Sequence, residues 1–141
     1  MYATAEDASS ASADRVRRST PEHLNEQIDL QTDRNIQHYT NTNQRIIERR
    51  ILELDKEWDV ERVLEVNAST LALTGLALGL TVNKKWFVLP VAVMGFLLQH
   101  GIQGWCPPLP VLRRLGIRTR GEIDRERYAL LDAYAARNGS R

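Results

Sequence analysis

The chain has 141 residues, the length of one small domain, and its 19 Lys and Arg nearly cancel its 18 Asp and Glu. The net charge of +1 argues against nucleic acid as a partner, and the single cysteine excludes both an internal disulfide and a zinc site built from cysteines alone. Between Val66 and Leu112 the only charged residues are Lys84 and Lys85, so an apolar middle separates two polar flanks.

The first twenty residues have the composition of a disordered tail. Small polar residues dominate, and after Tyr2 the only aliphatic anchor is Val16. The segment has no hydrophobic run, so we do not expect it to be a cleaved signal peptide. We expect residues 1–20 to form a disordered tail and residues 21–58 to form an amphipathic, helical, cytoplasmic region.

From about Asp33 to Lys56, apolar residues recur at steps of three and four, which predicts one amphipathic helix. The stripe consists of Ile36, Tyr39, Asn43, Ile46 or Ile47, Arg50, Ile51 and Leu54. Such a stripe can lie on a membrane, pair with a second copy as a short coiled coil, or fold back on the C-terminal helix. Asn43 slightly favours pairing, because one buried Asn can set the register of a coiled coil.

Two apolar segments follow, each close to the 20 or so residues that a helix needs to cross a bilayer. Asp59 is the expected N-cap of a helix from about Val60 to Val82, and the spacer Asn83-Lys84-Lys85 allows only a tight turn. We therefore expect an all-α fold with a transmembrane hairpin over residues 59–112, with spans at about 64–82 and 86–105. The alternative is a soluble hairpin buried in a larger core, but the flanks offer little apolar surface to cover it.

Aromatic and basic residues flank these segments in the pattern of a membrane hairpin. Trp58 and Trp105 stand at one end, and Trp86 with Phe87 at the other, where we expect them to anchor the interfaces. The basic residues near the outer ends are Arg45, Arg49, Arg50, Lys56, Arg62, Arg113, Arg114, Arg118, Arg120, Arg125 and Arg127. The positive-inside rule then predicts a multi-pass protein with both termini in the cytoplasm.

Small residues predict where the helices pack. Gly75 and Gly79 have the spacing that lets backbones approach closely in lipid, and Ala68 and Ala72 extend their face. This face predicts either a homodimer contact or packing against the hairpin's own second helix. A second stripe runs through Ala92, Gly95, Gln99, Gln103 and Cys106. We expect its glutamines to hydrogen-bond across helices, with a transport or ligand site as the alternative.

The stretch from Gly104 to Pro110 is the most distinctive. Its three prolines predict that the helix ends near Trp105 and that the chain leaves the bilayer there. Cys106 is then a buried, unreactive thiol or a sulfur-carrying or metal-binding one, and His100 is either simply hydrogen-bonded or a proton relay. A haem contact by the two residues is a weaker alternative.

The last segment, residues 113–141, predicts a cytoplasmic amphipathic helix from about Arg120 to Arg137. Thr119 and Glu122 have the spacing of a capping box ahead of its apolar residues.

At these residues the chain resembles the YgaP-like transmembrane domain family, a bacterial two-helix family of unknown function that is sometimes fused to a rhodanese domain. The resemblance spans roughly Leu64 to Ile117, and it rests on the small-residue first helix, on Gly104-x-Cys106-Pro107, and on Leu115-Gly116-Ile117. It implies a bacterial inner membrane, cytoplasmic ends and a homodimer. Sulfurtransferase activity is not carried over, because no rhodanese domain precedes the hairpin in this sequence.

We therefore expect a small integral inner-membrane protein without enzymatic activity, cofactor or metal, since no nucleophile–base or metal pattern is recognisable. Its expected partners are the lipid bilayer, a second copy of the chain and an unidentified protein, and its expected role is that of an anchor or scaffold. The alternatives are a redox or sulfur-handling accessory that uses Cys106, and a soluble helical adaptor.

Overall fold

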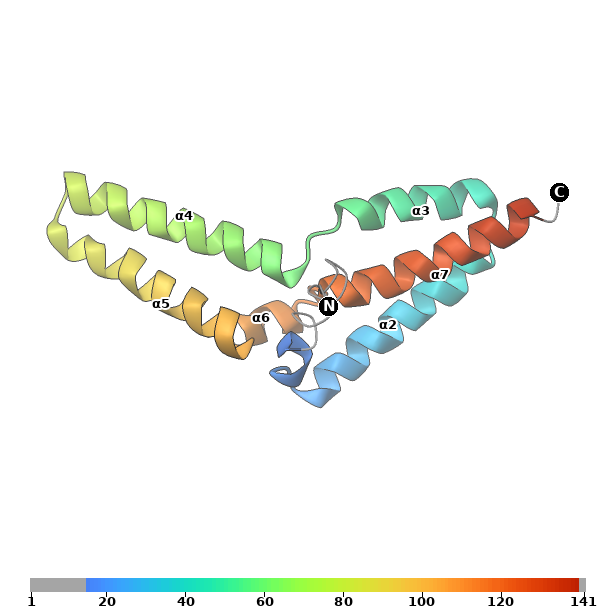
Figure 1. The fold of residues 1–141 in the computed structure, drawn as a ribbon, viewed down its shortest axis with the longest axis horizontal. Coiled ribbons are helices and arrows are strands. Elements are labelled where there is room, and N and C mark those ends of the chain that lie inside the picture. The colour runs from blue at the N-terminus through green and yellow to red at the C-terminus, as the bar shows by residue number, and fades with distance from the viewer. Residues whose placement is uncertain (1–14, 140–141) are drawn as a thin grey trace, which may run out of the picture.

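The structure is a computed structural model that describes residues 15–139. Within this range the chain is helical and has no strand. The elements are α2 (Glu22–Thr40), α3 (Gln44–Lys56), α4 (Val60–Thr81), η1 (Lys84–Phe87), α5 (Val88–Gln103), α6 (Leu109–Arg114) and α7 (Arg120–Gly139). Figure 1 shows two long arms that diverge from a junction near α6: a hairpin of α4 and α5, and a bundle of α2, α3 and α7.

The hairpin follows its local sequence signals, and the all-helical prediction is confirmed. The Asp59 carboxylate accepts a hydrogen bond from the Arg62 N–H at 2.8 Å, so it is the predicted N-cap of α4. After α4 ends, the Asn83 side chain accepts from the Lys85 N–H at 2.9 Å and starts the single turn η1. The chain then reverses into α5, and both helices lie in segments long and apolar enough to cross a membrane.

The segment that follows the hairpin contains a helix that the sequence did not predict. α5 ends at Gln103, and Gly104 adopts a left-handed conformation with φ of 74°. The chain then forms α6, although the prolines predicted no helix here. Pro110 lies in the first turn of α6, where a proline is tolerated because its absent N–H would have no helical partner.

The prediction of one continuous helix from Asp33 to Lys56 is wrong. The chain breaks after Thr40, and α2 extends back to Glu22. Asn43 is the N-cap of α3, where its side chain accepts from the Ile46 N–H at 3.1 Å, so it is not a register-setting residue of a coiled coil. The two helices turn back on each other, and both pack against α7. Of the three arrangements open to the apolar stripe, the structure has the one that folds back on the C-terminal helix.

The expected disordered tail of residues 1–20 is wrong for residues 15–20, while residues 1–14 lie outside the described range. Residues 15–18 form a helical turn, Val16 is buried in the junction, and Thr20 is buried beside it. The Thr20 hydroxyl donates to the Val16 carbonyl at 2.7 Å and closes this turn. This segment therefore belongs to the fold.

Two apolar clusters hold the described chain together. The junction cluster joins the first segment, α4 and α6, and it consists of Val16, Val60, Leu64, Cys106 and Leu109. The bundle cluster joins α3 and α7, and it consists of Ile47, Ile51, Leu54, Ile123 and Leu130. The predicted capping box starts α7, since the Thr119 N–H donates to the Glu122 carboxylate at 2.8 Å and the Glu122 N–H donates to the Thr119 hydroxyl at 3.3 Å.

Candidate functional site

The outer surface of the hairpin is apolar and uncovered by any other described part of the chain. Seven large aliphatic side chains on or beside α4 and α5 are between 66% and 79% exposed: Leu73, Leu80, Val82, Val88, Val91, Leu98 and Ile102. Only 17% and 11% of the residues in the apolar windows of the two segments are buried. Such a continuous patch marks an interaction surface, for lipid or for protein.

The two helices pack closely at the end of the hairpin that carries the turn. A Cβ added to Gly75 would lie 2.5 Å from the Pro90 Cδ, and one added to Gly79 would lie 2.8 Å from the Phe87 ring. Gly75 and Gly79 are buried, as is Ala72. These predicted packing residues therefore contact the hairpin's own second half.

The other residues of the predicted packing faces lie elsewhere. Ala68 and Ala92 line a pocket, whereas Gly95 faces open space. Gln99 donates from Nε2 to Gln103 Oε1 along α5 at 3.4 Å, so this hydrogen bond lies within one helix rather than across two.

The three tryptophans lie at the two ends of the hairpin. Trp58 precedes α4 and Trp105 follows α5, while Trp86 lies in η1 at the far end. All three are exposed, and the Arg62 guanidinium lies 4.5 Å from the ring centre of Trp58.

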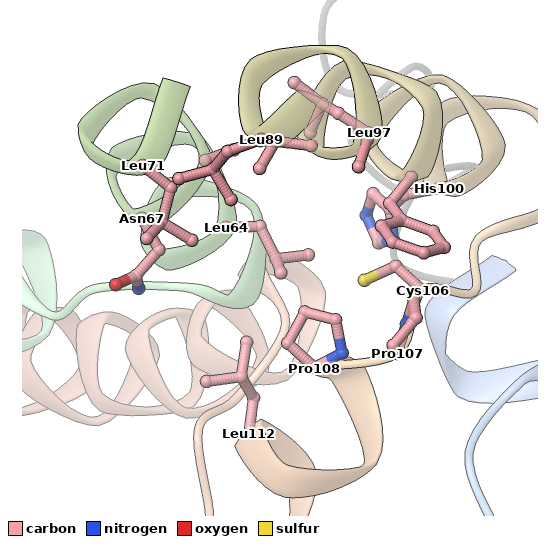
Figure 2. A pocket seen from close by; sticks show the side chains of 14 residues that line it. Leu64, Asn67, Leu71, Leu89, Leu97, His100, Cys106, Pro107, Pro108 and Leu112 are labelled. Atoms are coloured by element: carbon pink, nitrogen blue, oxygen red, sulfur yellow. The ribbon is translucent and has the colours of Figure 1, made fainter. Parts of the chain in front are cut away.

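Towards the junction the two helices diverge around a pocket of about 400 Å³ (Figure 2). Its walls are mostly aliphatic and come from α4, α5, the segment that leads into α6, and α6 itself. The lining residues are Leu64, Asn67, Ala68, Leu71, Leu89, Ala92, Val93, Phe96, Leu97, His100, Cys106, Pro107, Pro108 and Leu112. Leu71 and Phe96 are about half exposed, so the pocket opens to the surroundings of the hairpin.

Polar atoms gather at the junction end of this pocket. His100 is 5% exposed, and its Nε2 lies 3.0 Å from a carboxylate oxygen of Glu61, which belongs to the first turn of α4. The Cys106 thiol lies beside the imidazole, as Figure 2 shows. The other ring nitrogen, Nδ1, is buried and has no partner within hydrogen-bond distance and angle among the described residues, although the Cys106 thiol lies close to the ring. The pocket thus combines a long apolar wall with one unused polar atom.

The Gly104-x-Cys106-Pro107 motif shapes this end. A Cβ at Gly104 would lie 2.6 Å from the Arg15 Cβ, and the positive φ also favours glycine. The turn places Cys106 in the junction cluster, where it is 3% exposed. Pro107 and Pro108 form the adjoining wall of the pocket (Figure 2).

A buried ion pair fixes the exit of the hairpin to the bundle. The Arg113 guanidinium donates to both oxygens of Glu122 at 2.7 Å and to the Asn25 side-chain oxygen at 2.9 Å. Arg17 donates to the same carboxylate at 2.6 Å. Burial alone would raise the pKa of Glu122, but the hydrogen bonds and charges of the two arginines hold it below its usual value.

A second ion-pair network, centred on Arg118, fixes the entrance of the hairpin. Arg118 donates to Glu126 at 2.5 Å and to Glu57 at 2.6 Å, while its carbonyl accepts from the Val60 N–H at 3.0 Å. Arg50 donates to the other oxygen of Glu126 at 2.8 Å. Burial would raise the pKa of Glu126 as well, and the two arginines lower it.

A polar cavity of about 300 Å³ borders these arginines, and its wall includes Arg50, Arg113, Arg114 and Arg118. Three of the four form ion pairs with the two buried carboxylates of Glu122 and Glu126, which neutralise part of the positive charge on this wall. Within residues 15–139, no group of three or more His, Cys, Asp or Glu side chains is placed to hold a metal ion.

The sequence does not predict the contact between Glu61 and His100. It also does not predict the two buried ion pairs, Arg113 with Glu122 and Arg118 with Glu126. Glu122 and Glu126 lie four residues apart, next to the apolar stripe of α7, which is a weak signal that they face the core. Glu61 carries no such signal, because its contact with His100 depends on the register of the hairpin.

The comparisons with known proteins find no match: no family model, no curated protein and no solved structure matches this chain.

Proposed function

We propose that the chain is an integral membrane protein whose α4–α5 hairpin anchors the α2–α3–α7 bundle at the membrane surface. The observation that carries this proposal is the uncovered aliphatic surface of the hairpin. Moving one such side chain out of water stabilises a protein by about 1.5–3 kcal/mol, so the seven most exposed residues supply on the order of 10–20 kcal/mol in lipid. A soluble adaptor would have to leave this surface in water.

The distribution of charge supports a hairpin with both ends on the cytoplasmic side. The turn carries only Lys84 and Lys85, whereas the other basic residues within 15–139 lie on the side of the junction and bundle. The tryptophans at both ends of the hairpin suit two interfaces about 30 Å apart, since α4 alone is about 33 Å long. The resemblance to a bacterial family adds the inner membrane as the proposed location.

The anchor holds the bundle in a defined orientation. Arg113 and Arg118 connect the two ends of the hairpin to α7 through carboxylates that are buried. A scaffold role follows from this geometry, because the outer faces of α2, α3 and α7 are presented to a partner at a set angle. Since Gly75 and Gly79 already pack within the hairpin, self-association is proposed through the open face around Gly95 and Gln99.

A second candidate is a thiol-dependent accessory function of Cys106. The observation that favours it is the His100 ring beside the thiol, held in turn by Glu61, which is the order of nucleophile, base and orienting group. Replacing Cys106 with Ser separates the two candidates. Normal growth of the variant under sulfur and oxidative stress would count against this second function.

Extraction of membranes with alkaline carbonate tests the anchor. We expect the full chain to stay in the pellet and to require detergent for release. The double variant Leu73→Glu with Leu80→Glu should shift it to the carbonate-soluble fraction, or to aggregates that do not float with the membranes in a density gradient. The matched control is Leu30→Glu with Leu52→Glu, on exposed positions of the bundle, which should leave the protein in the pellet. Release of the unaltered chain by carbonate would refute the proposal.

A further inference from the structure

We propose that the pocket between α4 and α5 binds one acyl chain of a membrane ester lipid, and that His100 Nδ1 hydrogen-bonds the ester carbonyl. This inference rests on the proposed insertion of the hairpin. It concerns a defined site, distinct from the general contact of the outer surface with lipid.

The length and depth of the pocket suit one chain. Its wall on α5 runs from Leu89 to His100, a rise of about 16 Å, and the hydrocarbon of one leaflet is about 15 Å thick. The inner end of the pocket is closed where Gly75 meets Leu89 and Pro90. The other end lies at His100, about one turn before α5 ends at Gln103 and close in sequence to Trp105, at the level expected for the membrane interface.

The chemistry of the wall suits a flexible hydrocarbon. Aliphatic side chains of α4 and α5 dominate it, and only Phe96 and His100 among the lining residues carry an aromatic ring. A flat ring system would be better matched by facing aromatic planes. The partial exposure of Leu71 and Phe96 leaves an opening through which a chain enters sideways from the bilayer.

The polar end supplies one specific contact. Glu61 occupies Nε2, and Nδ1 is buried without a hydrogen-bond partner among the described residues. In the imidazolium form both ring nitrogens carry a proton, and Nδ1–H is then a buried donor without an acceptor. A buried donor without a partner is costly, and an ester carbonyl at the interface would satisfy it. Cys106 lies at the same end of the pocket. The Glu61 carboxylate beside the imidazole disfavours a second charged carboxylate there.

A photoreactive lipid tests the site. The full chain is reconstituted in vesicles of dialkyl ether phosphatidylethanolamine and phosphatidylglycerol, with a small fraction of ester-linked phosphatidylcholine that carries a diazirine in one acyl chain. Adducts are located by mass spectrometry. We expect them to concentrate on the pocket walls rather than on outward-facing residues such as Leu80 and Val91. Excess ester lipid should compete, and the dialkyl ether analogue, which lacks the carbonyl, should compete about fivefold less well, the loss expected for one ordinary hydrogen bond.

Three variants sharpen the result. His100→Gln keeps a donor near the Nε2 position for Glu61 and removes Nδ1, so it should abolish the difference between ester and ether lipids. Ala68→Phe fills the pocket and should remove the pocket adducts. Ala77→Phe makes the same change on an exposed position of α4 outside the pocket and should leave them unchanged.

Three outcomes would overturn the inference: adducts spread evenly around α4 and α5, equal competition by ester and ether lipids, or outward-facing residues that carry adducts while the pocket carries none. In each of these, outward-facing residues still react, so the anchor proposal survives. A complete lack of adducts on both helices would instead show that the hairpin is not in the bilayer.

Discussion

Glu126→Gln is the substitution that most directly probes how the bundle is held to the hairpin. The side chain is 0% exposed and accepts from Arg50 at 2.8 Å, from Arg118 at 2.5 Å and from Asn35 at 3.3 Å. Glutamine keeps the shape of the side chain but removes the charge, and it places an NH₂ group where one arginine donates. The buried guanidinium of Arg118 and the partly buried one of Arg50 then lose their shared counterion.

Breaking a buried ion pair by removing one partner costs about 3–5 kcal/mol. We expect the lower end, about 3 kcal/mol, because Arg118 keeps Glu57 and Arg50 keeps Glu53. Urea unfolding of the full chain in detergent micelles, followed by circular dichroism, gives the change in the free energy of unfolding. The matched control is Glu53→Gln, which removes an exposed partner of the same Arg50 and should change stability by at most about 0.5 kcal/mol. If both variants unfold at the same urea concentration, the buried network contributes no stability and the reasoning is wrong.

Three further predictions follow from the geometry. The pKa values of Glu122 and Glu126 are lower in the folded protein than in the unfolded chain, where they are about 4.3. The two carboxylates therefore stabilise the fold fully above the unfolded value, and this stabilisation is lost as the pH falls through the folded values. The urea midpoint should drop between about pH 6 and about pH 3. Gly75→Val places a Cβ 2.5 Å from Pro90 and should separate α4 from α5, which lengthens the distance between spin labels on the two helices. Gly104→Ala forces a left-handed alanine against Arg15 and should lower the free energy of unfolding by about 1–2 kcal/mol or more.

Each of these three predictions has a result that would contradict it, and the two substitutions also have control variants. A midpoint that is constant across the pH range would contradict the assignment of Glu122 and Glu126 as ionised, paired groups. Ala77→Val adds the same methyl groups at an exposed position of α4 and should leave the label distance unchanged. Gly101→Ala, where an added Cβ meets nothing within 4 Å, should not destabilise the protein. Equal behaviour of a test variant and its control would contradict the packing described here.

The hairpin is predictable because its signals are local. Residue types and spacing within one segment specify the Asp59 N-cap, the short turn and the Thr119–Glu122 capping box, and the structure has all three. The break between α2 and α3 is harder to predict, because the apolar spacing continues across it by coincidence. Asn43 carries two opposite tendencies, since it can cap a helix or lie inside a coiled coil, and here the local cap prevails.

The junction and the pocket are not predictable, because they join segments that are far apart in the chain. Arg17 and Glu122 are 105 residues apart, and His100 and Glu61 are 39 residues apart. From the sequence alone, His100 and Cys106 are separate features, one in α5 and the other in the segment that follows it. Only the register of the hairpin brings them together with Glu61 at the end of an apolar pocket.

The crossing of the membrane by the hairpin is the central claim, and cysteine accessibility tests it most directly. Two variants, Lys84→Cys in the turn and Glu22→Cys on the bundle, are made in a Cys106→Ser background, and each new thiol is exposed. A membrane-impermeant maleimide is applied to intact spheroplasts and to inverted membrane vesicles. We predict that Lys84→Cys reacts only in spheroplasts and Glu22→Cys only in inverted vesicles. Reaction of both positions from the same side would contradict the account.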